Sequence, residues 1–483
     1  MPITNYKYIN FFKVITPFYQ GDKLKSKIIA LSLLISSTYA DSSISYNNYI
    51  QDPFGRSPSG GGTQVHLINL YEKSGGGTQV IVESQIANQN VWQKWFGDGT
   101  YNLQGISAVI DNTKNSTNFA YGANLFAQTG SVAGFSFGGN LAIINPYFSS
   151  EINGTTIKQF LPANQVIFPN ELFTEYKIPS VFQVDAGWLF IETPWVTSLD
   201  SQALQKPTFQ GILVNYQMTK DILWTGMALN GYMPISQTGF SGNTLYNKGV
   251  DTSTQTPNIS SGSPGTYALG IQYGADKQWK ANLWGYQFLD YADLLYADTR
   301  YRLGQPTGFH MHFAAQAATE GSNGQNNAFS AASYGAPQSN MLGFQYGVYY
   351  TWFAFAASYN DVFGNSSAYG SGNMVSPYTY QIGTDPLYTS SLMSGLIEKS
   401  AGSAMKLAPS FFAFDKSLTI TPSFTQFWTN PYPYSNEWDL ALTYDMPHAK
   451  GLTLNGFLGY LQQPVPVAGG DMTYAEALIS YVY

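Results

Sequence analysis

Two of the chain's three arginines, Arg300 and Arg302, stand two residues apart, and Asp298 precedes them at the same spacing. Residues two apart in a β-strand lie on one face, so these charges share a face, while Tyr301 and Leu303 occupy the other. Arginine stays protonated and binds carboxylates through two parallel hydrogen bonds. The pattern therefore indicates a strand face that selects or orients an anionic group. The alternative is that Asp298 pairs with the arginines and only stiffens the strand.

Two histidines, His310 and His312, share one face of the next predicted strand, with Phe309, Met311 and Phe313 on the other. His-x-His is a recurring metal-ligand spacing. A metal site needs a third ligand, and the neighbouring sequence offers none. We therefore expect both histidines to lie on the lumen side of the strand, without a bound metal.

Near the C-terminus, Glu437, Asp439 and Asp445 also share a strand face. Paired carboxylates serve general acid–base catalysis, and a barrel hydrolase would also need a histidine beside a serine or an aspartate. The four histidines, at positions 66, 310, 312 and 448, lie in or beside predicted strands or a short turn. We interpret the carboxylates as charges on the lumen side of a strand, not as a catalytic set, and we expect no enzymatic activity.

The elements that position these residues are strands with a two-residue alternation. Trp438–Met446 places Trp, Leu, Leu, Tyr and Met on one face and Asp, Ala, Thr and Asp on the other. The same pattern recurs in further segments: 118–127, 134–144, 212–218, 222–232, 267–273, 279–288, 343–350, 352–359, 452–460 and 474–483. Alternation over about ten residues with aromatics near the ends is typical of strands between lipid and a watery lumen. Pro422 lies inside another segment, Leu418–Trp428, and predicts a bulge or a later strand start because proline removes a ladder donor.

The composition favours the same fold class. The 483 residues are 44% hydrophobic and 16% aromatic but only 11% charged, whereas soluble domains carry roughly 25% charged residues. No run of about 18 apolar residues suits a membrane helix. Short turns alternate with long polar connections at 237–264, 317–340, 360–385 and 462–471, which is how outer-membrane barrels are laid out. We predict an all-β fold, a transmembrane antiparallel β-barrel.

The first 40 residues have the features of a secretory signal peptide. Lysines precede the apolar run Ile28–Ile35, and small residues lead to Ala40, the order of segments found in cleaved signals. We place the start of translation at Leu24, so that 1–23 is an extension; a precursor peptide from 1–23, detected by mass spectrometry, would contradict this. Residues 41–90 are expected to hold an N-terminal segment and the first strand or strands, and 91–483 a single barrel.

Charge and residue content exclude several function classes. Residues 1–40 hold five Lys and one Asp, so their removal takes the net charge from −7 to −11, which is unsuited to nucleic-acid binding. The absence of cysteine excludes disulfides, thiol catalysis and Cys-ligated metals. A glycine-rich stretch, Ser59–Val65, is repeated at Ser74–Val80, but neither copy carries the Gly-Lys-Ser/Thr of a phosphate loop. We expect no cofactor.

Several parts of the chain resemble the OprD-type outer-membrane porins and, more weakly, their Hof-type branch. The resemblance rests on Glu437–Tyr444 with Lys450–Leu454, on Ile397–Ser400, on Gln287–Tyr296, and on Thr197–Ser201 with Pro207–Gly211. The first pair resembles the closing hairpin of the family, and the last pair resembles the loop that folds into the pore and returns to the wall. Together these parts span roughly residues 90–483.

This resemblance implies a barrel of about 18 strands, monomeric or homotrimeric, with a constricted lumen. We expect the constriction within Trp195–Pro207, where Asp200 and Ser201 match the inward loop. The family passes small polar solutes, often with a carboxylate. The chain departs from the family where Gln202–Lys206 replaces an expected arginine, and its arginine ladder is reduced to three arginines in the whole chain. These departures weaken the expectation of carboxylate selectivity, but not that of a pore.

The leading prediction is a porin in the outer membrane of a Gram-negative bacterium. It would be inserted into the lipid bilayer by the outer-membrane assembly machinery and would pass small polar or carboxylate-bearing solutes by diffusion. The predicted pore-lining residues are Asp200, Ser201, Asp298, Arg300, Arg302, His310, His312, Glu437 and Asp439. The alternatives are a surface adhesin with binding loops and, less favoured, a barrel hydrolase. Stepwise conductance in a planar bilayer distinguishes the channel from the adhesin.

Overall fold

The structure is a computed structural model. It describes the following residues: 94–96, 98–112, 116–149, 165–198, 206–233, 239–240, 264–274, 278–305, 308–323, 335–368, 371–374, 378, 386–397, 401–429, 434–462 and 471–482. The expected signal peptide and N-terminal segment lie outside these residues, as do Asp200 and Ser201. Within the described part, no helix has the length and apolar character needed to cross a membrane.

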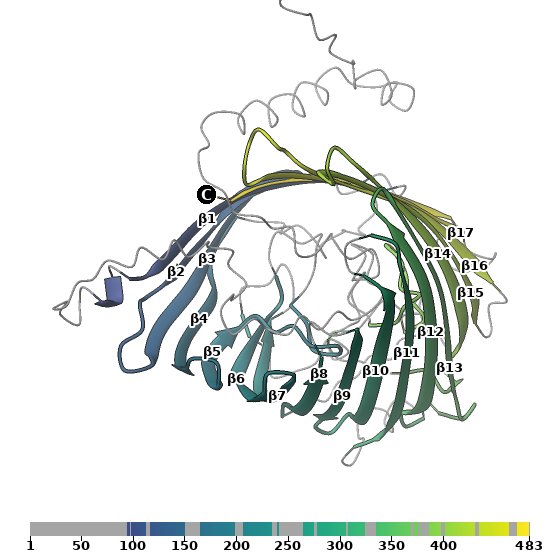
Figure 1. Ribbon diagram of the computed structural model, residues 1–483, viewed down its shortest axis with the longest axis horizontal. Coiled ribbons are helices and arrows are strands. Elements are labelled where there is room, and N and C mark those ends of the chain that lie inside the picture. The colour runs from purple at the N-terminus through teal and green to yellow at the C-terminus, as the bar shows by residue number, and fades with distance from the viewer. Residues whose placement is uncertain are drawn as a thin grey trace, which may run out of the picture. The chain divides into compact units, whose positions relative to one another are not determined.

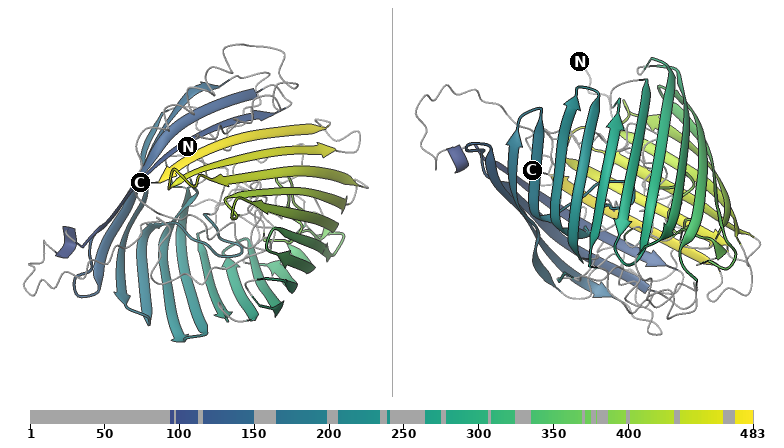
Figure 2. Two further views of the ribbon diagram at one scale, coloured as in Figure 1. Left: turned by 45° about the horizontal axis from the view of Figure 1, so that its top comes forward. Right: turned by 90° about the horizontal axis from the view of Figure 1, so that it is seen from below.

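Eighteen antiparallel strands form one closed sheet (Figure 1 and Figure 2). Their bounds are β1 (Thr100–Asn112), β2 (Ser116–Gln128), β3 (Phe135–Ser149), β4 (Val166–Ile178), β5 (Phe182–Leu189), β6 (Thr208–Thr219), β7 (Ile222–Met233), β8 (Thr266–Tyr273), β9 (Trp279–Phe288), β10 (Ala292–Gly304), β11 (His310–Ser322), β12 (Gln338–Tyr350), β13 (Phe353–Gly364), β14 (Gly402–Ala413), β15 (Leu418–Thr429), β16 (Ser435–Asp445), β17 (Leu452–Gln462) and β18 (Met472–Val482). Each strand pairs with the next along the chain, and β18 pairs with β1 from Gln104 opposite Val482 to Asn112 opposite Tyr474. The predicted antiparallel barrel and its strand number are confirmed.

Side chains alternate between the two faces of the wall, as the sequence pattern predicted. On β11, His312 is 6% exposed while its neighbour Phe313 is 46% exposed. The exposed positions carry aromatic and aliphatic residues such as Tyr301 and Leu303. A closed sheet has no unpaired edge, so an apolar outer face can contact lipid without unsatisfied backbone groups.

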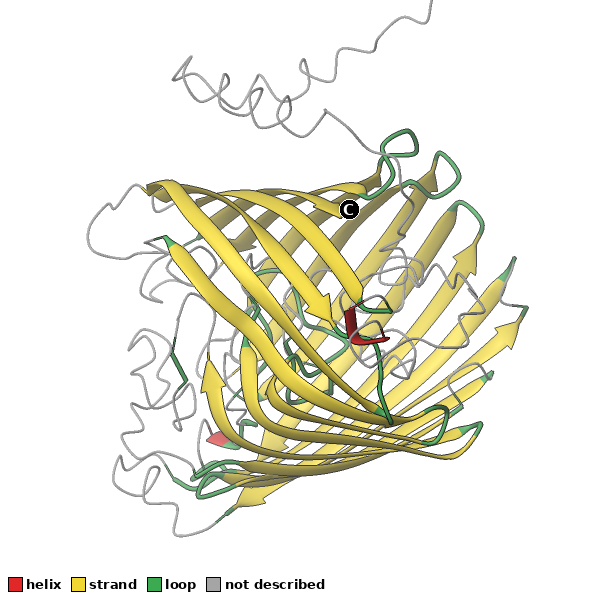
Figure 3. Cartoon of the chain, turned by 90° about the vertical axis from the view of Figure 1, so that its left-hand side faces the viewer, coloured by secondary structure: helices red, strands yellow, loops and turns green. Residues whose placement is uncertain are grey.

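The connections differ between the two ends of the barrel (Figure 3). At one end every connection is short, for example 220–221, 351–352 and 414–417. Most long connections lie at the other end, including 190–207 between β5 and β6 and 365–401 between β13 and β14. Described parts of these two connections pack inside the barrel, and they shape the candidate pore.

The bulge or later strand start that we expect at Pro422 is not found, although the pairing of β15 with β14 is interrupted there. Strand β15 begins at Leu418 and pairs with β16 through Pro422, which lies opposite Leu440. Thr421, Pro422 and Ser423 have no paired residue on β14, but the strands pair in the same register before and after them. That register sets Pro409 of β14 opposite Pro422, so the two residues that lack an N–H face each other, and neither a bulge nor a shorter strand is needed.

Candidate pore and its lining

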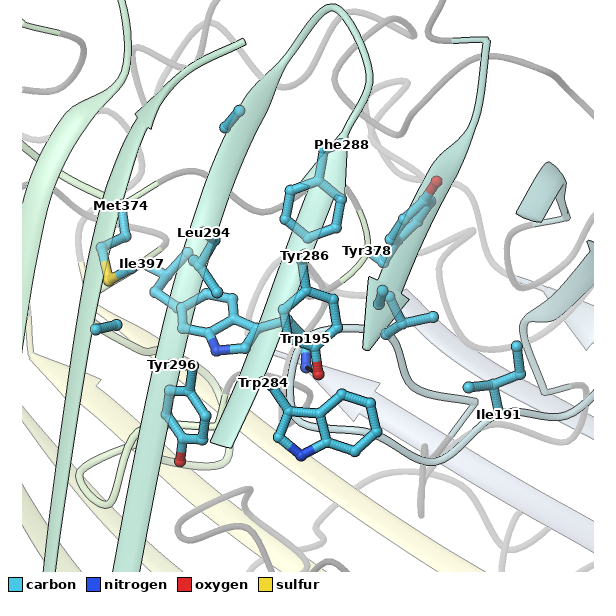
Figure 4. Close-up of a cluster of buried hydrophobic side chains, with 14 of the residues drawn as sticks. Ile191, Trp195, Trp284, Tyr286, Phe288, Leu294, Tyr296, Met374, Tyr378 and Ile397 are labelled. Atoms are coloured by element: carbon cyan, nitrogen blue, oxygen red, sulfur yellow. Dashed lines mark hydrogen bonds between the residues drawn. The ribbon is translucent and has the colours of Figure 1, made fainter. Parts of the chain in front are cut away.

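Residues 190–198, here called the first inward segment, pack against an aromatic row on the inner face of the wall. The row is Trp284, Tyr286 and Phe288 of β9, whose rings stack with centroids 5.6 and 5.7 Å apart. Trp195 is fully buried, and its ring meets Tyr296 of β10 edge to face at 6.1 Å. Figure 4 shows Trp195 beside this row, with Ile191 of the same segment nearby. Of the region Trp195–Pro207, in which we expect the constriction, residues 195–198 fold inward, and residues 199–205 lie outside the described residues.

The polar groups of the first inward segment are mostly satisfied within the segment itself. The Ser198 amide donates to the Ile191 carbonyl at 2.5 Å, and the Ile191 amide donates to Ser198 Oγ at 2.9 Å. Thr193 Oγ1 donates to the Val196 carbonyl at 2.8 Å. Because these groups are paired locally, the segment can present an apolar surface to the wall.

A second inward segment, residues 386–397, comes from the connection between β13 and β14, and all of it is buried. It contacts Glu437 of β16, a fully buried side chain. Glu437 Oε1 accepts a hydrogen bond from the Met393 amide at 2.6 Å, and Oε2 accepts one from Ser394 Oγ at 2.5 Å. Glu437 faces the lumen, as its strand position predicted, and there it anchors this segment.

Two more charged side chains of the wall contact the same segment. Asp439 Oδ2 accepts hydrogen bonds from the Leu392 amide at 3.3 Å and from Ser423 Oγ at 3.1 Å. Lys406 of β14 donates to the Ser390 carbonyl at 2.5 Å and interacts electrostatically with Asp439. Glu437, Asp439 and Lys406, together called the polar clamp, hold the second inward segment.

The predicted charged face of β10 is present. Asp298 and Arg300 are 9% and 8% exposed, and Arg302 is half-buried on the same face. Lys280 of β9 lies directly across from Arg300. The Asn282 amide nitrogen donates to both Asp298 oxygens, at 2.9 and 3.1 Å. This part of the lumen therefore combines three cationic residues with one carboxylate.

Tyr388 brings the second inward segment close to this charged face. Burial raises the pKa of the Tyr388 hydroxyl; the charge of Asp298 raises it further, while Arg300 opposes the rise. The hydroxyl therefore stays neutral at physiological pH. Tyr388 thus adds a buried, neutral polar group near Asp298 and Arg300.

The two histidines lie on the inner face, as predicted, and both are buried. Their rings are 4.9 Å apart, and the His310 ring stacks on Tyr349 of β12 at 4.6 Å. Among the residues that the structure describes, no three His, Cys, Asp or Glu side chains are grouped as a metal site would require. The structure brings the histidines together with Tyr349, whereas Glu437 and Asp439 belong to the polar clamp.

Three parts of this lining escaped the sequence analysis. Lys280 and Lys406 could have been found from strand alternation, since each has apolar or aromatic neighbours on both sides in sequence. The second inward segment had a weaker signal. Its apolar residues, Leu387, Leu392 and Met393 among them, follow directly on a polar connection and gave no sign of which wall they would contact.

The fold can be compared with known proteins. No protein-family model and no curated protein sequence matches the chain. Among solved structures, OccK8 (OprE) of Pseudomonas aeruginosa is 15% identical with a TM-score of 0.65, and a BenF-like porin from Pseudomonas fluorescens Pf-5 is 15% identical with a TM-score of 0.64. Pseudomonas aeruginosa OpdK, solved with vanillate, is 12% identical with a TM-score of 0.61. Each similarity covers 80% of this chain and 99% of the other. The chain therefore has the fold of the OprD-type porins.

Proposed function

We propose that the protein is a porin of a Gram-negative outer membrane through which small polar solutes diffuse passively. The observation that carries this proposal is a closed barrel with charged side chains on its inner face and two connections folded into it. The similarity in fold to porins supports it. Diffusion through such a lumen needs neither an energy source nor a catalytic group.

Size selection would arise where the two inward segments occupy the lumen. The first segment covers the aromatic row of β9, and the second covers the inner face of β14–β16. Each segment narrows the lumen, which in a barrel of 18 strands without inward connections would be a wide, water-filled channel. Solutes would pass through the part of the lumen that the two segments leave open.

Charge selection would depend on Lys280, Arg300 and Arg302, opposed by Asp298. Fixed cations outnumber carboxylates on this face of β9 and β10, which favours anions locally, and guanidinium groups suit carboxylates. Carboxylates elsewhere on the inner wall, such as Glu175 and Asp185, oppose this preference. The solved complex of OpdK with vanillate is consistent with small carboxylates as candidate solutes. The reduced number of arginines leads us to expect a modest anion preference.

The outer face suits a lipid environment. Exposed aromatic residues such as Trp279, Tyr301 and Trp352 line it, and such side chains are frequent at membrane interfaces. Insertion would require the assembly machinery of the outer membrane. Both a monomer and a homotrimer are compatible with one pore per chain.

Planar-bilayer recording tests the proposal. Purified, folded protein should give stepwise conductance that added solutes alter. A folded barrel that gives no steps would contradict the porin and favour the adhesin.

The charge filter is tested by replacing both arginines, Arg300→Gln and Arg302→Gln. The reversal potential across a salt gradient should shift toward cation preference, because two fixed positive charges leave the lumen. Lys220→Gln, at the exposed turn between β6 and β7, removes a charge outside the lumen and should leave the potential unchanged. An unaltered potential in the double variant would reject the filter.

A further inference from the structure

A compact group of aromatic and basic side chains lies on the inner face near the short-turn end of β10–β12. We call it the mouth cluster: Arg302, His310, His312, Tyr349 and Lys416. The His310 ring lies 4.6 Å from the Tyr349 ring at 24° and 4.9 Å from the His312 ring. Lys416 Nζ lies 5.1 Å from the centre of the Tyr349 ring and donates a hydrogen bond to its hydroxyl. Three strands and one turn thus converge on the same place.

Each of the two histidines has a glycine as a cross-strand partner. His310 has Gly304 across from it on β10, and His312 has Gly347 across from it on β12. A side chain at position 304 would approach the His310 Cβ to 3.1 Å, and the backbone there has φ +103°, which glycine adopts readily. Position 304 therefore needs glycine, because the backbones of β10 and β11 approach each other closely beside His310.

Lys416 reaches the cluster from a strained turn. Phe414, Asp415 and Lys416, which connect β14 to β15, have φ of 52°, 53° and 70°. Left-handed backbone is unfavourable for residues other than glycine, and such strain is frequent at functional sites. Here it accompanies the placement of an ammonium group over Tyr349.

The charged and titratable groups that face the imidazoles come from several elements. Arg302 of β10 lies directly across from His312, and Tyr349 of β12 lies directly across from His310. Lys416 approaches through Tyr349. Arg300 and then Asp298 follow farther along the same face of β10. The groups next to the histidines are therefore cationic or neutral, and the carboxylate on β10 lies beyond the two arginines.

We propose that the mouth cluster is an anion-binding subsite whose positive charge, and hence its affinity for a solute carboxylate, increases as the pH falls. Imidazole is the side chain that ordinarily changes charge between pH 5 and 8. When protonated, His310 and His312 add two charges to those of Arg302 and Lys416. Tyr349 offers a ring face to the body of an aromatic carboxylate. The inference rests on the proposed porin function, and short turns face the periplasm in outer-membrane barrels, so the subsite would lie at the exit of the pore.

Benzoate block of single channels tests the subsite. Benzoate added on the short-turn side should block wild-type current more tightly at about pH 5.5 than at about pH 8, by roughly two- to tenfold, as expected for two partly screened charges. The variant with His310→Asn and His312→Asn should lose this difference, because neither substituted side chain can gain a proton in this pH range. His448→Asn, at an exposed position in the turn between β16 and β17, should keep the wild-type difference.

The outcomes separate the two proposals. A conducting wild type whose benzoate block is the same at both pH values overturns the subsite and leaves the porin intact, as does a double variant that retains the full difference. A folded protein without conductance overturns the porin and the subsite together. The wild-type comparison needs no variant, so the test stands even where a substitution impairs folding.

Discussion

The polar groups of the two inward segments are satisfied in different ways. The first, 190–198, pairs its polar groups within itself and docks through Trp195 on the aromatic row of β9. The second, 386–397, uses the polar clamp, in which Glu437 and Asp439 accept hydrogen bonds from its amides and Lys406 donates to its backbone. Both segments also bury apolar side chains, among them Val196 of the first and Leu392 of the second, so the difference between them lies in their polar contacts.

The difference has a physical consequence. Apolar docking depends on shape and buried area, so it changes little with pH or salt but is sensitive to the loss of a large side chain. A buried charged clamp contributes through specific pairs, and removal of one partner leaves the others unsatisfied. Replacement of a single polar side chain of the wall should therefore displace the second inward segment. It should leave the first inward segment in place.

The largest effect is expected for Trp195→Ala. Removal of a fully buried tryptophan should weaken docking of the first segment by about 3–5 kcal/mol, which enlarges the lumen and increases single-channel conductance. Trp352→Ala is the matched control, because Trp352 is 58% exposed in the turn between β12 and β13. Equal conductance in the two variants would show that the first segment does not narrow the pore.

An intermediate effect is expected for Glu437→Ala. The buried Met393 amide and the Ser394 hydroxyl lose their acceptor, at a cost of about 1–3 kcal/mol. Conductance should rise and become noisier as the second segment moves, and the urea midpoint should fall. Asp98→Asn, at an exposed position before β1, should change neither. Quiet, wild-type-sized steps from the Glu437 variant would reject the clamp.

The smallest of these effects is expected for Ser394→Ala. It removes one donor to Glu437 and leaves the Met393 contact in place, so the clamp should weaken by about 1 kcal/mol. The urea midpoint should fall by less than in the Glu437 variant, with only a slight rise in channel noise. A shift as large as that of Glu437→Ala would mean that the hydroxyl, and not the amide, carries the contact.

The wall of the barrel could be predicted from the sequence because strand alternation is a local property. Arg300 and Arg302 were placed on one face from their spacing alone, and the structure has both there. Local sequence alone does not predict how Pro422 affects strand pairing, because that effect depends on which residue of the neighbouring strand lies opposite. Only the register shows that Pro409 lies opposite.

The inner lining was harder to predict because its contacts join residues far apart in the chain. The Trp195 amide donates to the Tyr286 hydroxyl at 3.4 Å across 91 positions, and Met393 meets Glu437 across 44. The residues around Glu437 in the sequence do not show whether its side chain contacts water in the lumen or binds a connection that folds inward. As selectivity residues, Asp298, Arg300, Arg302, His310 and His312 remain predictions, and so do Asp200 and Ser201, which lie outside the described residues.

Single-channel conductance of the wild type, beside that of the variant with both Trp195→Ala and Glu437→Ala, tests the central claim most directly. We predict discrete wild-type steps and clearly larger steps in the double variant, because both inward segments then lose their anchors. Folding of each barrel is checked by its heat-dependent electrophoretic mobility. A folded wild type without steps, or a folded double variant with steps of wild-type size, would contradict a passive pore narrowed by these two segments.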